Sequence, residues 1–445
     1  PPNILFIMAD DLGYADLSCY GAPTIRTPAI DRLARDGMRL TQAYANSAVC
    51  SATRTALITG RYQDRLRMGL EEPLANNRAI GLPPSHPTLP SRLKAIGYET
   101  TLIGKWHLGY LPDYDPLKSG YDHFYGIRGG ALDYYSHAAG TEPDLWDGAV
   151  PVKEQGYLTD LFGERAMQAV RRQAGATHPF FMSLHFNAPH WPWEAPGDEA
   201  ESKRIEGKPL FHWDGGTLDT YRRMVEAMDR QVGRVLDELE RTRLARNTIV
   251  VFTSDNGGER YSNTWPFSGR KTELLEGGLR VPAIVRWPGR VPARSSSTQV
   301  AMTMDWMPTL LAAAGTEPDP AYPSDGIDLA PQLLRGEAPV PRSVYWRYKA
   351  NGQRAVRDGD FKALKIAGNS FLFNVVEDPL ERANLKERRP ERFHALTAKW
   401  DAWNRTMLPE VAESYTDNFT GDHMADHIAT PAVDPKAVEG PVPWP

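Results

Sequence analysis

The stretch Asn3-Ile4-Leu5-Phe6-Ile7-Met8-Ala9, followed at once by Asp10-Asp11, is the clearest structural signal near the start of the chain. An unbroken apolar run of this kind is typical of a parallel strand that is buried on both of its faces. The two carboxylates mark the point where the strand ends. The stretch therefore predicts a sheet with helices on both faces and polar side chains at one edge.

The rest of the chain alternates between strands and helices. Further buried strands are expected at residues 98–103, 179–184 and 248–253, and helices at 89–96, 157–173 and 219–243. Another helix is expected to begin at Pro28, with Thr27 as its N-cap, and to stop at Gly37. This alternation predicts an α/β sandwich with a large, mostly parallel central sheet flanked by helices.

The texture of the sequence changes after about residue 320, where prolines become frequent. Short antiparallel strands are expected at residues 344–348, 353–357, 361–366 and 370–375, followed by a helix at 390–403. We therefore predict a catalytic unit over residues 1–335, a small antiparallel-sheet subdomain over 336–405 and an irregular tail over 406–445.

Polar and charged residues follow the predicted strands. They are Asp10, Asp11, Lys105, His107, His190, Asp255 and Asn256. Because ligands of such sheets bind beyond the carboxyl ends of the strands, we expect these side chains around one cleft. The oxygen donors among them suit Ca²⁺, or Mg²⁺ as the alternative, better than zinc. Asp-Asp and Asp-Asn-Gly are also ordinary turn sequences, so turns alone remain the other interpretation.

The stretch Cys50-Ser51-Ala52-Thr53-Arg54 opens a short helix that is expected to stop at Gly60. Cys50 has three interpretations from the residues alone: a buried cysteine, a low-pKa thiolate nucleophile, or a modified residue. Arg54 adds a positive charge one turn into the helix. Together with Lys105, His107, His190 and Lys271, it supplies the cations and proton donors that transfer of a tetrahedral anion requires.

These motifs resemble, in order and approximate spacing, those of type I sulfatases. The matching segments are Asp10-Asp11, Cys50-Ser51-Ala52-Thr53-Arg54, Gly104-Lys105-Trp106-His107-Leu108-Gly109, Ala188-Pro189-His190-Trp191-Pro192, Asp255-Asn256-Gly257-Gly258, Gly269-Arg270-Lys271 and Glu276-Gly277-Gly278-Leu279-Arg280. In that family the cysteine is converted to formylglycine, whose hydrate is the nucleophile. Ala52 stands where the family more often has proline.

The resemblance implies an alkaline-phosphatase-like fold and a role for each site residue. Calcium would be held by Asp10, Asp11, Asp255, Asn256 and the formylglycine made from Cys50. Arg54 and His107 would hold the hydrated aldehyde, and Lys105, His190 and Lys271 would grip the sulfate. His190 would protonate the leaving alcohol, while His107 would act as the base that regenerates the aldehyde. His185, inside a predicted strand, is interpreted as structural.

Residues 120–137 resemble a segment of the N-acetylgalactosamine-4-sulfatase (arylsulfatase B) branch and of bacterial polysaccharide sulfatases. The resemblance implies an exo-acting enzyme for a sulfated glycan or oligosaccharide. The candidate substrate-pocket residues are Asp133, His137, Trp191, Trp193 and Glu194. Aromatic packing between loops is the alternative for each of them. Asp422, His423, Asp426 and His427 in the tail are interpreted as a solvated terminus rather than a cover over the cleft.

Other functions remain open from the sequence. The same superfamily contains phosphonate and phosphodiester hydrolases, and a relative that leaves Cys50 unmodified would only bind sulfated glycans. A cysteine hydrolase using Cys50 with His107 leaves the carboxylate cluster without a role. A rate comparison on sulfate and phosphate esters separates the first alternative from a sulfatase.

The composition limits the class of partner. The chain has 445 residues and a net charge of −5, which gives no indication of nucleic-acid binding. No apolar run approaches the roughly 20 residues that span a bilayer. Only Cys19 and Cys50 are present, so no structural disulfide is expected if Cys50 is modified. We expect a mature periplasmic or extracellular protein, with a cytoplasmic one as the alternative, matured by a formylglycine-generating or anaerobic enzyme.

Overall fold

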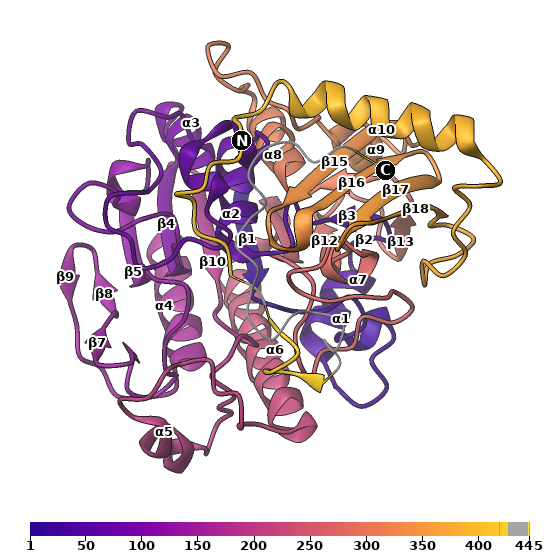
Figure 1. The fold of residues 1–445 in the computed structure, drawn as a ribbon. Coiled ribbons are helices and arrows are strands. Elements are labelled where there is room, and N and C mark those ends of the chain that lie inside the picture. The colour runs from indigo at the N-terminus through magenta and orange to yellow at the C-terminus, as the bar shows by residue number, and fades with distance from the viewer. Residues whose placement is uncertain (418, 426–443, 445) are drawn as a thin grey trace.

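A ten-stranded sheet forms the centre of the protein in the computed structural model, which describes residues 1–417, 419–425 and 444 (Figure 1). The strand order is β13-β2-β12-β11-β1-β10-β4-β5-β8-β9. The five middle strands are parallel to one another: β11 (Thr248–Ser254), β1 (Asn3–Ala9), β10 (Phe180–His185), β4 (Glu99–Lys105) and β5 (His123–Ile127). Their carboxyl ends therefore lie along one edge of the sheet.

The outer strands make the sheet mixed. On one side β12 (Ala283–Arg286) is antiparallel to both β11 and β2 (Met38–Leu40), and β13 (Ser295–Ser297) is parallel to β2. On the other side β8 (Trp146–Asp147) and β9 (Val150–Pro151) continue the sheet with antiparallel pairings. The predicted α/β sandwich is confirmed, with its parallel part at the centre.

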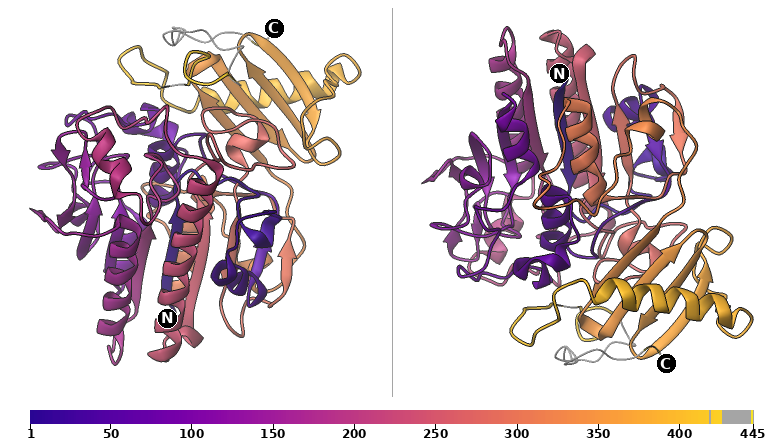
Figure 2. Two further views of the ribbon diagram at one scale, coloured as in Figure 1. Left: turned by 90° about the horizontal axis from the view of Figure 1, so that it is seen from below. Right: turned by 90° about the horizontal axis from the view of Figure 1, so that it is seen from above.

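Alternate residues of β1 face two separate hydrophobic cores, as expected for a strand buried on both sides. Leu5 and Ile7 belong to one core, and Ile4, Phe6 and Met8 belong to the other. The first core is covered by α1 (Pro28–Arg35), α4 (Leu158–Gln173) and α6 (Leu218–Arg241). The second is covered by α2 (Cys50–Thr59), α3 (Leu89–Ala95), α8 (Trp306–Ala314) and α9 (Ala330–Leu334). Figure 2 shows these layers from two further directions.

The N-terminus of α1 is capped from another helix. Thr27 precedes Pro28 as predicted, but its side chain makes no capping hydrogen bond. Instead, the carboxylate of Asp229 on α6 accepts from the backbone N–H groups of Ala29 at 3.1 Å and Ile30 at 2.8 Å. The sequence favoured Thr27 because N-cap preferences are local, whereas this cap comes from a residue distant in the chain.

A four-stranded antiparallel sheet packs beside the large sheet. It consists of β15 (Ser343–Tyr348), β16 (Gln353–Asp358), β17 (Phe361–Ile366) and β18 (Asn369–Asn374), and α10 (Pro390–Asn404) lies across it (Figure 1). Ala52 and Ala56 of α2 belong to the core of this small sheet, whereas Leu57 and Ile58 belong to a core of the large one. Helix α2 is therefore enclosed between the two sheets. The division of the chain at residues 335 and 405 stays a prediction.

The described part of the chain also contains short strands, short α-helices and several 3₁₀-helices. The short strands and α-helices are β3 (Ala43–Tyr44), β6 (Ala138–Ala139), β7 (Glu142–Pro143), β14 (Ala301–Met302), α5 (Glu199–Ile205) and α7 (Glu276–Leu279). Among the described residues, we find no helix with both the length and the apolar character that crossing a membrane requires.

Candidate active site

The polar residues predicted to share a cleft do meet at the carboxyl edge of the parallel strands. Asp10 and Asp11 follow β1, Asp255 and Asn256 follow β11, and Lys105 is the last residue of β4. His190 lies in the loop after β10, the strand between β1 and β4. All of these side chains are buried. The site is therefore assembled by the topology of the sheet.

The acidic cluster is held by direct contacts between its members. The backbone N–H of Asp11 donates to Oδ1 of Asp255 at 3.2 Å, and Nδ2 of Asn256 donates to Oδ1 of Asp11 at 2.7 Å. Asp11 has a left-handed backbone with φ of 63°. Asp is one of the few non-glycine residues that tolerate this conformation, which is often found at functional sites.

Three buried cations surround the cluster, and each contacts one carboxylate. Lys105 Nζ lies 2.6 Å from Asp10, and Lys271 Nζ lies 2.8 Å from Asp11. Arg54 donates to Asp255 Oδ2 through Nε at 3.1 Å and through Nη2 at 2.8 Å. Although burial opposes it, Arg54 and Lys105 hold the pKa of Asp255 below its ordinary value.

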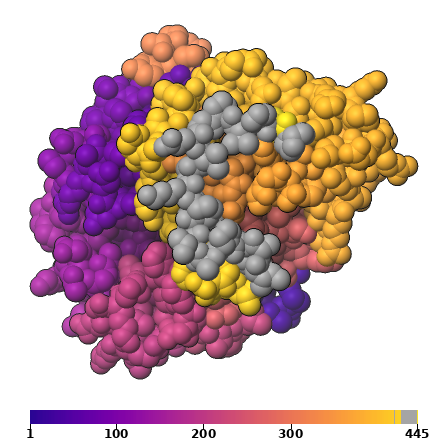
Figure 3. All heavy atoms as spheres, viewed as in Figure 1, coloured from indigo at the N-terminus to yellow at the C-terminus, as the bar shows by residue number. Residues whose placement is uncertain are grey.

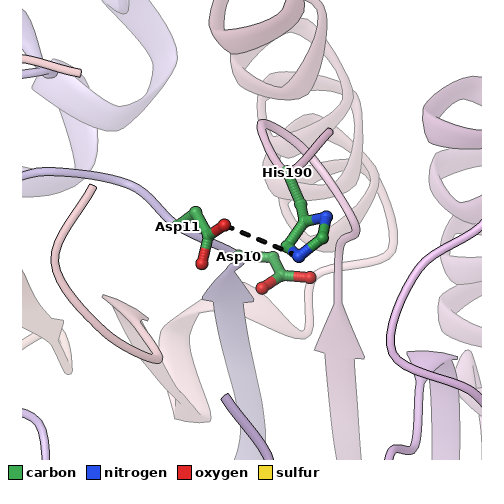
Figure 4. A group of neighbouring side chains, drawn as sticks. All are labelled: Asp10, Asp11 and His190. Carbon is green, nitrogen blue, oxygen red and sulfur yellow. Dashed lines mark ion pairs between the residues drawn. The ribbon is translucent and has the colours of Figure 1, made fainter. Parts of the chain in front are cut away.

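The donor set fits a hard divalent cation. Oδ1 of Asp10 and Oδ1 of Asn256 are buried and have no hydrogen-bond partner among the described residues. Burial and the nearby Asp255 raise the pKa of Asp10. The raised pKa means that the negative charge of the ionised carboxylate is not fully compensated by its neighbours. Ligand atoms of Asp10, Asp11 and His190 lie within 4.8 Å of one another (Figure 4). Those of Asp10, Cys50 and Asp255 also lie within 4.8 Å of one another. Orphaned carboxylate and amide oxygens are what calcium or magnesium would satisfy.

Cys50 faces this cluster from the first turn of α2. Its side chain is 1% exposed, and α2 ends at Gly60, which has φ of 68° as predicted for a C-terminal stop. Burial raises the pKa of the Cys50 thiol. Lys105 and Lys271 lower this pKa and Asp10 and Asp255 raise it, and the net effect is an increase. The environment therefore disfavours a thiolate, which is contrary to the low-pKa nucleophile that was one interpretation of the sequence.

The hydrogen bonds of His107 and His190 define which ring nitrogen carries the proton. His107 Nε2 lies 2.8 Å from the carbonyl oxygen of Leu74, and its Nδ1 has no partner among the described residues. His190 Nδ1 lies 2.6 Å from the carbonyl oxygen of Trp191, and its Nε2 lies 3.2 Å from Lys271 Nζ. Because a carbonyl only accepts, His107 keeps a lone pair on Nδ1 and His190 on Nε2.

Burial lowers the pKa of both histidines well below the ordinary value, and neighbouring lysines lower it further. The positive charge of Lys105 lowers the pKa of His107, and that of Lys271 lowers the pKa of His190. Burial opposes a charged Lys271, but Asp11 raises its pKa, so this ammonium stays protonated beside His190. A charged lysine that donates a hydrogen bond thus lies next to a neutral histidine that accepts it. His185 also lies in this region, with Nδ1 3.4 Å from Arg54.

A cavity of about 170 Å³ opens onto Cys50, His107, His190 and Lys271. Its remaining lining residues are Val49, Pro73, Leu74, Ala75, Gly130, Ala131, Trp191, Phe211, Thr272, Tyr415, Asp417 and Phe419. The ring centroid of Trp191 lies 4.2 Å from that of His190 and 5.0 Å from that of Phe211. The cavity therefore combines charged residues at its base with aromatic walls.

The C-terminal tail forms one wall of this cavity. The backbone N–H of Tyr415 donates to Glu71 Oε2 at 2.8 Å, and that of Asp417 donates to the carbonyl of Glu72 at 2.9 Å. The ring of Phe419 meets that of Trp213 edge to face at 5.3 Å. Figure 3 shows the described tail in yellow on the surface, next to purple and pink parts of the chain.

Beyond that wall, His423 stacks on Trp213 with ring centroids 4.2 Å apart, and both Asp422 and His423 are exposed. The expectation of a solvated terminus stays a prediction. Asp426 and His427 lie outside the described residues.

Among the predicted substrate residues, Trp191 lines the cavity and the others do not. Asp133 Oδ1 accepts from the backbone N–H groups of Tyr135 and Ser136, and His137 Nε2 lies 2.9 Å from the carbonyl of Gly156. Trp193 is 1% exposed, and Glu194 is fully buried. Substrate roles for Asp133, His137, Trp193 and Glu194 stay predictions.

Several cavity residues were missed by the sequence interpretation. Phe211 lies in a loop with no repeating pattern, and Tyr415 and Phe419 belong to a tail that was expected to be irregular. The only local signal was the presence of large aromatic side chains in otherwise polar segments. Such residues often mark a contact that the sequence alone does not identify.

Comparisons with known proteins agree with this geometry. A family model described as sulfatase matches residues 2–316. The chain is 34% identical over 389 residues to N-acetylgalactosamine-6-sulfatase of Sus scrofa, covering 82% of this chain and 71% of that protein. It is 29% identical to arylsulfatase J of Mus musculus, covering 92% of this chain and 76% of that protein.

A solved structure of Ps i-CgsB in complex with k-i-k-neocarrahexaose has a similar fold. Its TM-score is 0.84 at 30% identity, covering 97% of this chain and 98% of that chain. The alternatives left open by the sequence, a phosphonate or phosphodiester hydrolase and a protein that only binds glycans, are thus less well supported. The chain belongs to the sulfatase family, and it is a sulfuric ester hydrolase.

Proposed function

We propose that the protein hydrolyses a sulfate ester on a sulfated carbohydrate, with formylglycine made from Cys50 as the nucleophile. The observation that carries this proposal is the position of Cys50, whose sulfur shares a cluster with carboxylate oxygens of Asp10 and Asp255. A nucleophile beside a divalent cation suits attack on an anionic ester, because the cation offsets the negative charge. The carbohydrate is supported by the glycan named with Ps i-CgsB and by the N-acetylgalactosamine-6-sulfatase relative.

Asp10, Asp11, Asp255 and Asn256 would hold Ca²⁺ together with the modified Cys50. The ion would supply Lewis-acid polarisation of sulfate oxygens. Hydrated formylglycine would supply a geminal diol, with one hydroxyl as the nucleophile toward sulfur and a second hydroxyl whose deprotonation would release sulfate. The overall reaction consumes one water and gives an alcohol, inorganic sulfate and a proton.

The cationic side chains of this chain bind and orient the sulfate. Lys105 and Lys271 are fixed by Asp10 and Asp11, so their ammonium groups are already in place when the substrate enters. Arg54 is fixed through two bonds to Asp255 and keeps its charge beside Cys50. These contacts spare the substrate the free-energy cost of ordering flexible lysine and arginine side chains.

His190 is the proposed proton donor to the departing alcohol oxygen when the bond between sulfur and that oxygen breaks. In the free protein its Nε2 carries a lone pair next to Lys271. The negative charge of a bound sulfate ester raises the pKa of the imidazole and favours its protonated form, which can pass its proton to the alcohol oxygen. His107, with a lone pair on Nδ1, is the proposed base for the second half of the reaction.

The shape of the cavity supports action at a chain end. The tail residues Tyr415, Asp417 and Phe419 close one side of the cavity that contains Cys50. A sugar whose sulfate reaches Cys50 would have this wall on one side, where the polymer could not continue. A sugar at the end of a chain therefore fits the cavity better than one inside a long polymer. We therefore propose an exo-acting enzyme.

Peptide mass spectrometry across residues 47–54 tests the nucleophile directly. Protein made with a formylglycine-generating or anaerobic maturation enzyme should lose sulfur and gain oxygen at Cys50, and should release sulfate from glycan and aryl sulfates. Cys50→Ala protein from the same host is the control and should release none. An unmodified thiol in protein from its own host would contradict the formylglycine mechanism.

A further inference from the structure

A second cavity of about 530 Å³ adjoins the one that contains Cys50. The two cavities share the lining residues Leu74, Gly130, Ala131 and Trp191. The tail residues Tyr415 and Phe419 line only the first cavity. A ligand that reaches Cys50 can therefore continue into the second cavity on the side away from the tail.

The second cavity has the side chains that a sugar ring requires. Tyr110, Trp146 and Trp191 line it and are each partly exposed. Asn76 and Glu142 are exposed polar residues of the same lining. Aromatic faces pack on the apolar faces of a sugar, and polar groups bond to its hydroxyls. The larger volume suits a unit beyond the one that carries the reacting sulfate.

Arg78 is the exposed cation of this lining. Its guanidinium lies 5.8 Å from the centre of the Tyr110 ring, and no carboxylate among the described residues lies within ion-pair distance of it. An arginine held over an aromatic ring is partly ordered before a ligand arrives. Its planar donors match the oxygens of a sulfate group.

The other arginine of the lining is buried. Arg128 is 1% exposed, its Nη2 donates to Asp115 at 2.6 Å, and its guanidinium lies 4.5 Å from the centre of the Trp146 ring. Its Nε and Nη1 are buried without a hydrogen-bond partner among the described residues. Asp144 accepts from the backbone N–H of Gly129 at 2.7 Å and from Trp146 Nε1 at 2.8 Å. Arg78 is therefore the arginine of this lining that is exposed to an incoming anion.

We propose that the second cavity binds the next sugar of the substrate chain and that Arg78 pairs with a sulfate group on that sugar. This inference rests on the proposed function, because it requires a sulfated glycan at Cys50. It adds a requirement for a second sulfated unit, and it makes Arg78 a specificity-determining residue. Together with the tail wall, it orients the glycan with its end at Cys50 and its remaining units toward Arg78.

Binding to Cys50→Ser protein tests the inference without turnover. Titration calorimetry would compare neocarrahexaose and a chondroitin sulfate hexasaccharide with N-acetylgalactosamine 6-sulfate. We expect at least one hexasaccharide to bind more tightly than the monosaccharide. Adding Arg78→Gln should reduce that preference about tenfold, as expected for a charge-assisted contact. Arg78→Lys should retain part of it, because the charge remains but the planar fork is lost.

Arg246→Gln is the matched control, because it removes the same charge from an exposed position before β11, at the opposite edge of the sheet. It should leave the preference for hexasaccharide unchanged. The proposal is overturned if neither hexasaccharide binds more tightly than the monosaccharide, or if Arg78→Gln and Arg246→Gln behave alike. Sulfate release by matured wild-type protein is measured separately, so failure of the proposed function itself would appear there and not in the binding ratio.

Discussion

Lys105 donates a hydrogen bond to Asp10 across 2.6 Å, and both side chains are fully buried. The bond uses Oδ2 of Asp10 and leaves Oδ1 without a partner among the described residues. One oxygen of this carboxylate is therefore neutralised by the protein, and the other remains available to a cation.

Calcium should stabilise the folded protein through this oxygen cluster. We expect the unfolding temperature to rise with calcium concentration, since a ligand at a hundredfold its Kd adds about 2.7 kcal/mol of stability. Asp10→Asn should weaken the response because it removes a charge from the site. Asp237→Asn, at an exposed position on α6, is the control. An identical calcium response in both variants would place the ion elsewhere.

The stability of the protein should fall as pH rises because of Glu194. Burial, and then the nearby Asp133, raise the pKa of Glu194 to about 9. Between about pH 5 and pH 9 the folded state keeps a proton that an unfolded glutamate has lost. The stabilising contribution is thus complete below the unfolded pKa and is lost as pH rises through the folded pKa.

The pH dependence can be measured from unfolding temperatures at about pH 5, 7 and 9. In Glu194→Gln the unfolding temperature should fall less steeply with pH, because the amide can still donate to Asp133 but does not titrate. Glu199→Gln, at an exposed position of α5, should decline as the wild type does. A Glu194→Gln variant with the same slope as the wild type would refute the raised pKa.

Lys362 should contribute strongly to stability. Its Nζ lies 3.1 Å from Glu276 and 2.8 Å from Glu381, and all three side chains are fully buried. Lys362→Met leaves buried carboxylates without this partner, which costs about 3–5 kcal/mol. Lys399→Met breaks a half-exposed pair with Asp358 and should cost about 0–1 kcal/mol. Urea unfolding measures both, and equal losses would contradict the prediction.

Phe419 should keep the tail against the cavity. Phe419→Ala removes the edge-to-face contact with Trp213, a type of contact worth about 0.5–1.5 kcal/mol. We expect faster hydrogen exchange at the amides of Tyr415 and Asp417 and a higher KM for the glycan. Phe371→Ala removes a ring pair in the small sheet and should leave those amides protected. Unchanged exchange in Phe419→Ala would mean that the backbone bonds alone hold the tail.

The sequence predicted the parts of the site that depend on strand ends. Asp10 and Asp255 were placed together because each follows a long apolar run, and neighbouring parallel strands end at one edge. The long elements were also predicted within a few residues, as for β17 (Phe361–Ile366). Long runs carry enough periodic signal to be recognised in the sequence.

The parts that were missed depend on contacts between distant segments. Strands such as β8 (Trp146–Asp147) are too short to show a pattern and form only because a neighbouring strand presents an edge. The cap from Asp229 on α1, and the tail wall at Phe419, likewise arise from tertiary packing. No local propensity contains this information.

Helix α2 is buried along its whole length, with Cys50 in its first turn. The cavity of about 170 Å³ that opens onto Cys50 can admit a small ligand but not the active site of another protein once the two sheets have closed over α2. The proposed conversion of Cys50 would therefore take place on a nascent or unfolded chain, in competition with folding. A variant that folds faster than the wild type would then carry less formylglycine, so its specific activity would fall although its structure was sound.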